Sequence, residues 1–534
     1  MPSFRQLTSP SLSSTRLILL CAVCFTAFYN LAFFRNSFAI YGATAGGLAF
    51  IGSLALFLFA ATTLFLSVLC LRYLTKPILI FIVFGAAAAN YFMYRFNIVV
   101  DTTMLTNVAK TDSREVHDLL TLGLFTQLLL LGVLPSLVIL RTRIERQRLG
   151  KALWARLKLM VLALVLIILS LSPFTSYYTS FFREHKLLRY YVNPATFLYS
   201  SGQFLQLALD TPAPSQRLAV GADAHVPEAD ISRELIVLVV GEAARADHFG
   251  LNGYERNTTP RLANENVINF GDITSCGTAT AYSLPCMFSL IPREDFNLDK
   301  ATMQENLLDV LTHAGVQVLW RDNNSDSKGV ADGVAFEDWR SPDINPVCDV
   351  ECRDIGMLSG LDAYIAAHPS GDLVIVLHQM GNHGPAYYRR YPAEFEVFTP
   401  ICRSAELNDC TTAQIINAYD NALLYTDYFL SEVIAFLRGY DDSFETALYY
   451  MADHGESLGE KGLYLHGLPW LLAPQAQKHV GSFLWFGENF RVDRSKTAAH
   501  AQQPASHDNY SHTVLDLLEI QSTVFDPDLS LLER

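Results

Sequence analysis

Five hydrophobic stretches dominate the first third of the chain and constrain its fold more than any other feature. They cover roughly residues 17–38, 46–70, 77–98, 119–140 and 157–176. Each is close to the length of about 20 residues that an α-helix needs to cross a hydrocarbon core about 30 Å thick. The first stretch is too long for a cleavable signal peptide, and four more stretches follow it. We therefore expect a membrane domain of five transmembrane helices over residues 1–176.

Basic residues predict how these helices are oriented. Eleven Lys and Arg lie before the first stretch, between the second and third, and between the fourth and fifth, where Glu145 is the one acidic residue. Cytoplasmic loops carry such an excess of Lys and Arg. These three segments and the N-terminus are therefore predicted to be cytoplasmic. Five crossings then place the chain after residue 176 on the outer side of the membrane.

The chain after the fifth stretch divides into a short aromatic segment and a long soluble one. Residues 177–215 mix aromatic and charged residues, which is typical of helices in the membrane interface, and lead into a predicted soluble domain over 216–534. Residues 1–210 hold 18 Lys and Arg against 7 Asp and Glu, so the net charge of −14 for the whole chain leaves −25 for residues 211–534. This acidic half argues against a nucleic-acid partner and favours a protein that holds a cation.

Six cysteines in the soluble half form three close pairs along the sequence. They are Cys276, Cys286, Cys348, Cys352, Cys402 and Cys410. An even number of closely spaced cysteines is typical of an oxidising compartment. Proximity favours pairing each cysteine with its neighbour, although six cysteines allow 15 pairings. Reduced thiols and a structural zinc site are the alternatives, and disulfides are favoured because the soluble half has no CxxC pair for a zinc ribbon.

The soluble half alternates short β-rich apolar runs with helical patterns, which predicts a doubly wound α/β sheet. Four runs end in polar residues: LIVLVV at 235–240, VQVLW at 316–320, LVIVL at 373–377 and TALYYM at 446–451. In open parallel sheets the ligand binds outside the carboxyl ends of the strands. We therefore expect these four strand ends to converge on one site.

Glu242, Asp453 and His454 are the candidate metal ligands of this site. Glu242 follows the first of the four runs, and the Asp-His pair follows the last. Two carboxylates and an imidazole suit zinc and leave a fourth position open, so we predict Zn²⁺ as the cofactor. Taken singly, each residue could instead cap or salt-bridge a strand end. Their occurrence together at converging strand ends favours the metal site.

A threonine is the candidate for the fourth ligand and for the nucleophile. Residues 274–290 read TSCGTATAYSLPCMFSL, in which small polar residues give way to an apolar run, so Thr278 or Thr280 should begin a helix. N–H groups at a helix N-terminus favour a phosphate, and zinc coordination would activate the hydroxyl. On local sequence alone, both threonines could instead be plain helix caps.

Three further residues are candidates for contact with a substrate. His383 and His466 lie in short loops rich in Gly and Pro, where a histidine beside a metal can hydrogen-bond a phosphate or protonate a leaving alkoxide. Lys328 follows two asparagines and could add positive charge for a phosphate. Each of the three also has a plain structural or surface interpretation.

Six motifs resemble those of the lipid A phosphoethanolamine transferases, a family that includes intrinsic enzymes and the mobile colistin-resistance enzymes. In chain order they are VVGEAARADHFGLNGYERNTTP, SCGTATAYSLPCMFS, LWRDNNSDSKGV, MGNHGP, YMADHGESLGEKGLYLHG and SHDNYSH. The resemblance covers essentially the whole chain and implies an α-helical membrane domain joined to an alkaline-phosphatase and sulfatase-like α/β domain. Two positions depart from the family pattern, Ala243 where Thr is usual and Gly481 where Pro is common, and neither is a proposed ligand.

The family pattern implies a role for each candidate residue. It implies a zinc ion held by Glu242, Thr280, Asp453 and His454, with Thr280 as the nucleophile. It also implies that His383 and His466 contact the substrate phosphate, and it supports the three disulfides between neighbouring cysteines.

A predicted outer loop at about residues 96–118 adds three candidate substrate-binding residues. Asn107, Thr111 and Glu115 are spaced at i, i+4 and i+8, so they form one polar stripe on a helix at the membrane surface. Spacing alone favours a solvated helix face. The three residues also match the family's periplasmic loop, which is associated with the lipid substrate, and this favours a functional role.

The resemblance implies a monomeric, multi-pass enzyme of the bacterial inner membrane with a periplasmic catalytic domain. Such an enzyme transfers phosphoethanolamine from phosphatidylethanolamine to a lipid A phosphate through a phosphothreonine intermediate. The modified lipid A then attracts cationic polymyxins less strongly. Three alternatives remain: transfer to the lipopolysaccharide core sugar, a phosphoglycerol transferase or phosphodiesterase of the same superfamily, and a catalytically silent metal-binding membrane sensor. The presence of all four candidate ligands argues against the silent sensor.

Overall fold

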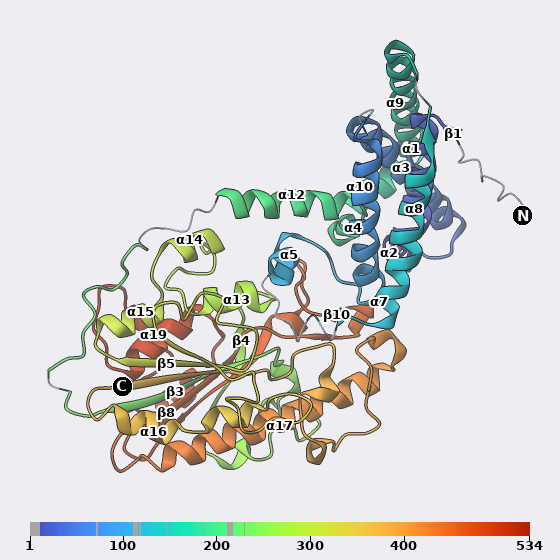
Figure 1. The fold of residues 1–534 in the computed structure, drawn as a ribbon. Coiled ribbons are helices and arrows are strands. Elements are labelled where there is room, and N and C mark those ends of the chain that lie inside the picture. Colours follow the sequence, from blue (N-terminus) through green and yellow to red (C-terminus); the bar gives the residue numbers. More distant parts are fainter. Residues whose placement is uncertain are drawn as a thin grey trace, which may run out of the picture. The chain divides into compact units, whose positions relative to one another are not determined.

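The computed structural model has two compact units (Figure 1). It describes residues 11–70, 73–109, 116, 119–145, 147–183, 185–210, 217–228 and 230–533. The first unit comprises Met1–Leu105 and Leu120–Gln206, and the second comprises Thr106–Leu119 and Leu207–Arg534. The predicted soluble domain, residues 216–534, therefore lies wholly within the second unit. The predicted domain boundaries at residues 176 and 215 stay predictions.

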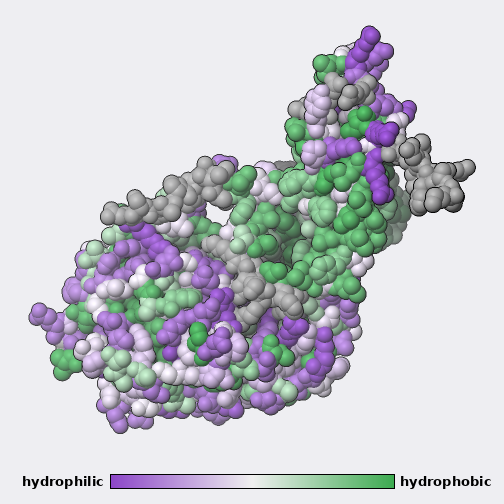
Figure 2. Space-filling view, viewed as in Figure 1, coloured by the Kyte–Doolittle hydropathy of each residue, from purple (hydrophilic) through white to green (hydrophobic). Residues whose placement is uncertain are grey.

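The first unit contains helices that are long and apolar enough to cross a membrane. Among the described residues, four helices qualify alone: α3 (Ala45–Leu69), α4 (Thr75–Arg95), Leu122–Arg141 and Leu149–Phe174. The third is continuous through α7 (Leu122–Gln127), the π-helix η1 (Leu128–Val133) and α8 (Leu134–Arg141), and the fourth joins α9 (Leu149–Leu171) to the short 3₁₀ turn η2 (Ser172–Phe174). Figure 2 shows hydrophobic surface over this unit, whereas the second unit presents a mostly hydrophilic surface.

The first predicted span is a bent pair of helices. α1 (Ser14–Phe28) and α2 (Leu31–Tyr41) differ in direction by 52°. Asn30 stabilises the break, because its Nδ2 donates to the carbonyls of Phe25 at 2.9 Å and Asn193 at 2.6 Å, and its Oδ1 accepts the Asn193 N–H at 2.9 Å. Main-chain groups inside a membrane need such partners. If the bent pair is one span, the unit has the five predicted crossings.

Short helices follow the last span and occupy the predicted interfacial segment. They are α10 (Thr175–Arg183), α11 (Lys186–Tyr190) and α12 (Ala195–Asp210). α10 packs on α3 through aromatic rings, with Tyr177 stacked on Phe50 at a centroid distance of 5.0 Å and Tyr178 at 5.0 Å from the same ring. The aromatic residues of this helix are thus used for packing against α3.

An eight-stranded mixed sheet forms the core of the second unit. The strand order is β12-β4-β11-β8-β3-β7-β5-β6. The bounds are β3 (Glu234–Gly241), β4 (Ile268–Thr274), β5 (Gln317–Asp322), β6 (Ala335–Asp338), β7 (Leu373–His378), β8 (Glu445–Ala452), β11 (His479–Phe486) and β12 (Ala505–Ser506). β11 runs antiparallel to both of its neighbours, and the other pairs are parallel. The predicted doubly wound sheet is confirmed, with one reversed strand inserted.

Helices cover both faces of this sheet. In Figure 1, α16 (Leu361–Ala367) and α17 (Thr412–Arg438) lie on one face, and α13 (Thr280–Met287), α15 (Leu307–His313) and α19 (Asp508–Leu517) lie on the other. Every residue of β3, β7 and β8 is buried, as expected for central parallel strands covered on both sides. The four predicted runs form β3, β5, β7 and β8, which are neighbours in the order β8-β3-β7-β5.

Three disulfides lie in the second unit. They join Cys276 to Cys286, Cys348 to Cys352 and Cys402 to Cys410, which is the pairing that proximity favoured. Each closes a short loop, so each restricts the unfolded chain locally. Cys21, Cys24 and Cys70 of the first unit are free thiols.

Replacing Asn30 by Ala should destabilise the first unit, because buried main-chain groups of Phe25 and Asn193 lose their side-chain partner. Hydrogen bonds between membrane helices contribute about 0.6–2 kcal/mol each, so we expect a loss of about 1–3 kcal/mol in the free energy of unfolding. The measurement is the melting temperature of the full-length protein in detergent. Thr126→Ala, which removes one exposed hydrogen bond to Leu122 within a helix, is the control. Equal melting temperatures for the two variants would contradict this role of Asn30.

Candidate active site

Four predicted residues meet in a buried cluster at the carboxyl edge of the sheet. β3 pairs with β8 so that Gly241 lies opposite Ala452, and Glu242 and Asp453 therefore leave the sheet side by side. His454 follows Asp453, and Thr280 is the first residue of α13. Glu242 is 1% exposed, Thr280 4%, and the Asp-His pair 0%. The site is therefore closed to bulk water in this conformation.

The other candidate threonine has a different partner. The Thr278 hydroxyl donates to the carbonyl of Leu468 at 2.7 Å, and the structure thus separates the two threonines that the sequence left open. Thr280 Oγ1 instead lies 3.0 Å from Glu242 Oε2 and 3.2 Å from His454 Nε2. Thr280 is therefore the threonine in the cluster.

The distances within the cluster suit a four-coordinate cation. His454 Nε2 lies 3.5 Å from Glu242 Oε1 and 3.5 Å from Asp453 Oδ2, in addition to its 3.2 Å approach to Thr280. Ligand atoms about 2.0–2.1 Å from a tetrahedral zinc ion are about 3.3–3.4 Å apart. Four separations between the candidate ligands, 3.0 to 3.5 Å, are close to this edge length, and Glu242 takes part through both of its oxygens.

Hydrogen bonds outside the cluster orient the donor atoms. His454 Nδ1 donates to the carbonyl of Gly455 at 2.9 Å, which leaves the lone pair of Nε2 for a ligand. Asp453 Oδ1 accepts the N–H groups of Ala243 at 3.2 Å and His454 at 2.7 Å. Asp453 Oδ2 is buried and accepts no hydrogen bond from the part of the chain that the structure describes. A buried carboxylate oxygen of this kind needs a partner, which a cation would supply.

The turn after β3 brings Glu242 and the Ala243 N–H to the site. Ala243 adopts φ = 53°, a left-handed conformation that is costly for a residue with a side chain. The Tyr419 hydroxyl donates to the Ala243 carbonyl at 2.7 Å and accepts the Arg245 N–H at 2.9 Å, which holds the turn. Asn324, after β5, donates its Nδ2 to Glu242 Oε2 at 2.9 Å. The end of β5 thus reaches the site through Asn324.

β7 reaches the site by its loop and not by its last residue. His378 faces away and pairs with Asp322, with Nδ1 and Oδ2 2.8 Å apart. The following loop holds His383, whose ring centroid lies 5.9 Å from that of His466. Burial, followed by the nearby charge of Arg390, lowers the pKa of His383 well below its usual value, so this ring is neutral at pH 7.

His466 stands beside the cluster as a further donor. Its ring centroid lies 4.2 Å from that of His454, and ligand atoms of Glu242, His454 and His466 lie within 4.8 Å of one another. His466 Nδ1 lies 2.7 Å from Glu456 Oε2, and the Tyr387 hydroxyl donates to Glu456 Oε1. A hydrogen bond from Nδ1 to the carboxylate directs Nε2 of His466 away from Glu456. Sequence reasoning did not find Glu456, although it lies two residues after the His454 ligand candidate.

A second buried acid positions the loop of His383. Asp354 Oδ1 accepts the N–H of Met380 at 2.9 Å, and Oδ2 accepts that of Gly381 at 3.2 Å. Asn323 Nδ2 also donates to Asp354 Oδ1, at 2.7 Å. Burial raises the pKa of Asp354, against the effect of these donors. The sequence gives no local signal for Asp354, because its partners are far away along the chain.

The start of α13 is closed by a disulfide and is tied to the end of β8 by two links. The Cys276–Cys286 disulfide encloses Thr280, and the Ser283 hydroxyl donates to the carbonyl of Asp453. His507 accepts the Cys276 N–H on Nδ1 at 3.1 Å, and its Nε2 donates to the Ala452 carbonyl at 3.0 Å. Burial lowers the pKa of His507 to about 4, which keeps the ring neutral for both bonds. These contacts fix the first turn of α13, and with it Thr280, relative to the end of β8.

The remaining predicted residues are Lys328 and the three residues of the predicted outer loop. Lys328 has φ = 54°, donates its ammonium group to the Ser325 carbonyl, and is close enough to His383 to lower the pKa of that ring. Asn107 is half-buried on α5 (Thr102–Ala109). Thr111 and Glu115 lie outside the described residues. The roles predicted for the three loop residues stay predictions.

Two family models match the chain. Residues 58–209 match the model described as phosphoethanolamine transferase EptA/EptB, and residues 234–520 match the sulfatase model. The first match lies in the part of the chain that contains the apolar helices, and the second lies in the part that contains the sheet. The sulfatase match agrees with the mixed sheet flanked by helices.

Known proteins are similar over nearly the full chain. Phosphatidylethanolamine transferase Mcr-1 of Escherichia coli is 43% identical over 522 residues, covering 96% of each chain. Phosphoethanolamine transferase EptA of E. coli K12 is 37% identical, covering 98% of this chain and 97% of its own. The solved integral membrane lipooligosaccharide phosphoethanolamine transferase A of Neisseria meningitidis superposes with a TM-score of 0.94 at 35% identity, covering 98% of this chain and 99% of that one.

The donor set predicts that the purified protein retains a divalent metal, and we expect zinc. Asp453→Asn should lower the metal content by at least about tenfold, because a ligand carboxylate becomes a weakly coordinating amide. Metal content per chain is measured by elemental mass spectrometry after gel filtration.

Asp427→Asn is the matched control for this measurement. Asp427 is a buried carboxylate on α17 that accepts the N–H groups of Arg261 and Leu262, away from the cluster, and burial raises its pKa to about 6. An amide accepts only one of these two N–H groups, so Asp427→Asn controls for the stability lost in a buried Asp→Asn change, and its metal content should stay unchanged. Equal metal loss in both variants, or none in either, would contradict the assignment of Asp453 as a ligand.

Proposed function

The chain belongs to the phosphoethanolamine transferases, and we propose that it moves a phosphoethanolamine group from phosphatidylethanolamine to a phosphate of lipid A. The position of Thr280 carries the proposal. Its hydroxyl lies within 3.2 Å of both Glu242 and His454, at the first turn of a helix and in a buried site. A threonine placed in this way is arranged as a nucleophile and not as a surface cap.

Glu242, Thr280, Asp453 and His454 would hold a zinc ion, which would lower the pKa of the Thr280 hydroxyl and stabilise negative charge on a phosphate. The first step is attack of Thr280 Oγ1 on the phosphorus of the donor lipid. A phosphothreonine ester bond forms, and the bond from phosphorus to the diacylglycerol oxygen breaks. The N-terminus of α13 supports the negative charge that develops on the phosphate oxygens.

His466 is the candidate for the proton that the departing diacylglycerol oxygen requires, and His383, which is neutral, can donate an N–H hydrogen bond to a phosphate oxygen. His466, held through Nδ1 by Glu456, and His383 both lie beside the cluster. In the second step a lipid A phosphate oxygen attacks the phosphothreonine. The bond from phosphorus to Thr280 Oγ1 breaks, and the hydroxyl is regenerated. The acceptor gains an ammonium group, which reduces its negative charge and its attraction for cationic polymyxins.

The proposed location is the bacterial inner membrane, with the N-terminus in the cytoplasm and the catalytic unit in the periplasm. Basic residues concentrated before the first span and in alternate loops support this orientation. Three disulfides in the second unit support an oxidising compartment for it. Donor and acceptor are then both lipids that the membrane unit could present.

Thr280→Ala should abolish transfer while leaving the fold intact, because it removes the attacking oxygen. We expect a loss of at least about 10³-fold, since loss of a nucleophile in related covalent mechanisms has effects of this size or larger. The readout is mass spectrometry of lipid A from cells that produce each variant. The increment must be that of phosphoethanolamine and not of phosphoglycerol, and the position of the addition separates lipid A from core sugar.

Thr278→Ala is the control, because Thr278 lies two residues away and bonds to Leu468 instead. It should retain transfer within roughly tenfold, the range expected for loss of one hydrogen bond. Lipid A that is still modified by Thr280→Ala, or unmodified by both variants in well-folded protein, would overturn the assignment of the nucleophile.

Glu456→Gln should slow transfer by about 10–100-fold without loss of folded protein, because an amide cannot hold the imidazolium of His466 as a carboxylate does. We expect kcat to fall while KM stays nearly unchanged. We also expect the acidic limb of the profile of rate against pH to shift. Glu460→Gln is the control, since Glu460 pairs with Arg245 at the half-exposed edge of the same loop. An unchanged pH profile in Glu456→Gln would show that the role of Glu456 is only structural.

A further inference from the structure

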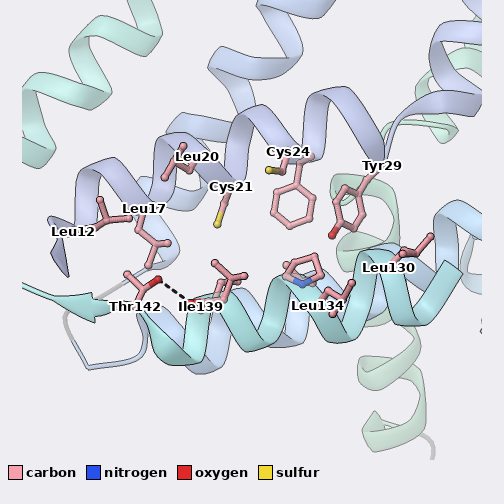
Figure 3. Close-up of a pocket in the computed structure, with 14 residues that line it drawn as sticks. Leu12, Leu17, Leu20, Cys21, Cys24, Tyr29, Leu130, Leu134, Ile139 and Thr142 are labelled. Carbon is pink, nitrogen blue, oxygen red and sulfur yellow. Dashed lines mark hydrogen bonds between the residues drawn. The ribbon is translucent and has the colours of Figure 1, made fainter. Parts of the chain in front are cut away.

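An apolar groove lies between the first and fourth predicted spans of the membrane unit. It has a volume of about 360 Å³ and is lined chiefly by α1 and α8. Figure 3 shows Leu17 and Cys21 of α1 facing Leu134 and Ile139 of α8 across the gap. This volume lies at the lower end of the range of about 300–1,000 Å³ that is typical of ligand sites.

The groove has a buried floor and exposed walls. The floor residues Cys21 and Val83 are 8% and 3% exposed and belong to the core of the unit. The wall residues Leu20 on α1, and Leu134 and Val138 on α8, are 53%, 47% and 63% exposed. The groove therefore opens sideways to the hydrocarbon around the helices. An occupant can enter from the membrane without passing through the protein.

Oxygen-bearing side chains along the groove already have partners. The Tyr29 hydroxyl donates to the carbonyl of Leu131 in the π-helix η1, and the Thr142 hydroxyl donates to that of Val138 at 2.8 Å. A polar ligand would lose its hydration and gain no strong hydrogen bond from these side chains. The chemistry of the lining thus selects a hydrocarbon chain.

One end of the groove is basic. Thr142 and Leu12 line this end, where β1 (Ser11–Leu12) pairs with β2 (Arg143–Ile144). Arg141 and Arg143 flank Thr142, and Arg16 precedes Leu17. All three arginines are exposed, and Glu145, which follows β2, is the one acidic residue in the described stretches 11–28 and 134–145 that form this end. Their positive charge is therefore available to an anionic group next to the groove.

We propose that this groove binds one acyl chain of an anionic phospholipid, with the lipid phosphate at Arg16, Arg141 and Arg143. The apolar groove and the three arginines contribute differently to binding. Packing against a groove gives an acyl chain little advantage over surrounding lipid, because lipid tails are as apolar as the side chains that line it. Selectivity therefore comes from the arginines, each contributing about 1 kcal/mol towards an anionic headgroup. This proposal is independent of the transfer reaction.

The test uses the full chain in vesicles of phosphatidylethanolamine and phosphatidylglycerol. The probe is phosphatidylglycerol with a photoreactive diazirine in one acyl chain, and cross-linked peptides are identified by mass spectrometry. Cross-links should concentrate in Leu17–Phe25 and Leu130–Ile139. Cys24→Trp, which fills the groove from an exposed wall position, should abolish most of them. Val161→Trp, on the exposed face of α9 and outside the groove, should leave them unchanged.

The headgroup part of the proposal has its own variant. Arg141→Gln with Arg143→Gln should reduce the preference for phosphatidylglycerol over an equally labelled phosphatidylethanolamine probe by roughly tenfold or more. Equal labelling by both probes in the unmodified protein would overturn the anionic headgroup.

Two further outcomes decide whether the groove is a site at all. Cross-links spread evenly over α3 and α9, or unaffected by Cys24→Trp, would show only random surrounding lipid. If Cys24→Trp fails to fold, Leu134→Trp blocks the groove from the opposite wall and must give the same loss. Thr280→Ala protein should cross-link as the unmodified protein does, so failure of the proposed transfer reaction cannot be confused with failure of this site.

Discussion

The pairing of β3 with β8 is the constraint on which the active site depends. In this register Gly241 lies opposite Ala452, so Glu242 and Asp453 leave the sheet as neighbours. A Cβ on Gly241 would lie 2.3 Å from the buried Tyr450 hydroxyl, so this strand end requires glycine. A slip of one residue would turn each side chain of β3 to the opposite face of the sheet. The glutamate would then leave the sheet on the wrong side to meet His454.

Because the cluster is buried, its two carboxylates need a partner of opposite charge. Two carboxylates in a closed site would repel each other and lose their hydration, and such groups are stable only with a cation or a proton. Backbone N–H groups satisfy one oxygen of Asp453, which leaves the other for the centre of the cluster. His383 is kept neutral by the same burial, so a cation at the centre meets little competing positive charge. The Thr280 hydroxyl lies between a carboxylate oxygen of Glu242, to which it donates, and Nε2 of His454.

Local sequence patterns predicted the helices and strands that are set by residues close together in the chain. The apolar runs identified the spans and the four central strands, and the small-to-apolar transition predicted a helix start at Thr278 or Thr280, where the structure has Thr280. The bend at Asn30 escaped prediction because its partner is Asn193, 163 residues away. Glu456 and Asp354 escaped for the same reason, since each is defined by tertiary contacts to a histidine or its loop. The reversed β11 lies between strands distant in sequence, so no local pattern marks its direction.

The two units use buried polar groups in opposite ways. In the membrane unit, several buried polar side chains bond to main-chain groups within the unit, as Asn30 does with Asn193 and Tyr29 with Leu131. The side chains that line the groove between α1 and α8 are mainly apolar. In the second unit, buried side chains are first oriented by the main chain and then converge on a common point. The second unit thus leaves carboxylate, imidazole and hydroxyl groups facing one another at the end of its sheet, and the α1–α8 groove of the membrane unit leaves mainly apolar groups.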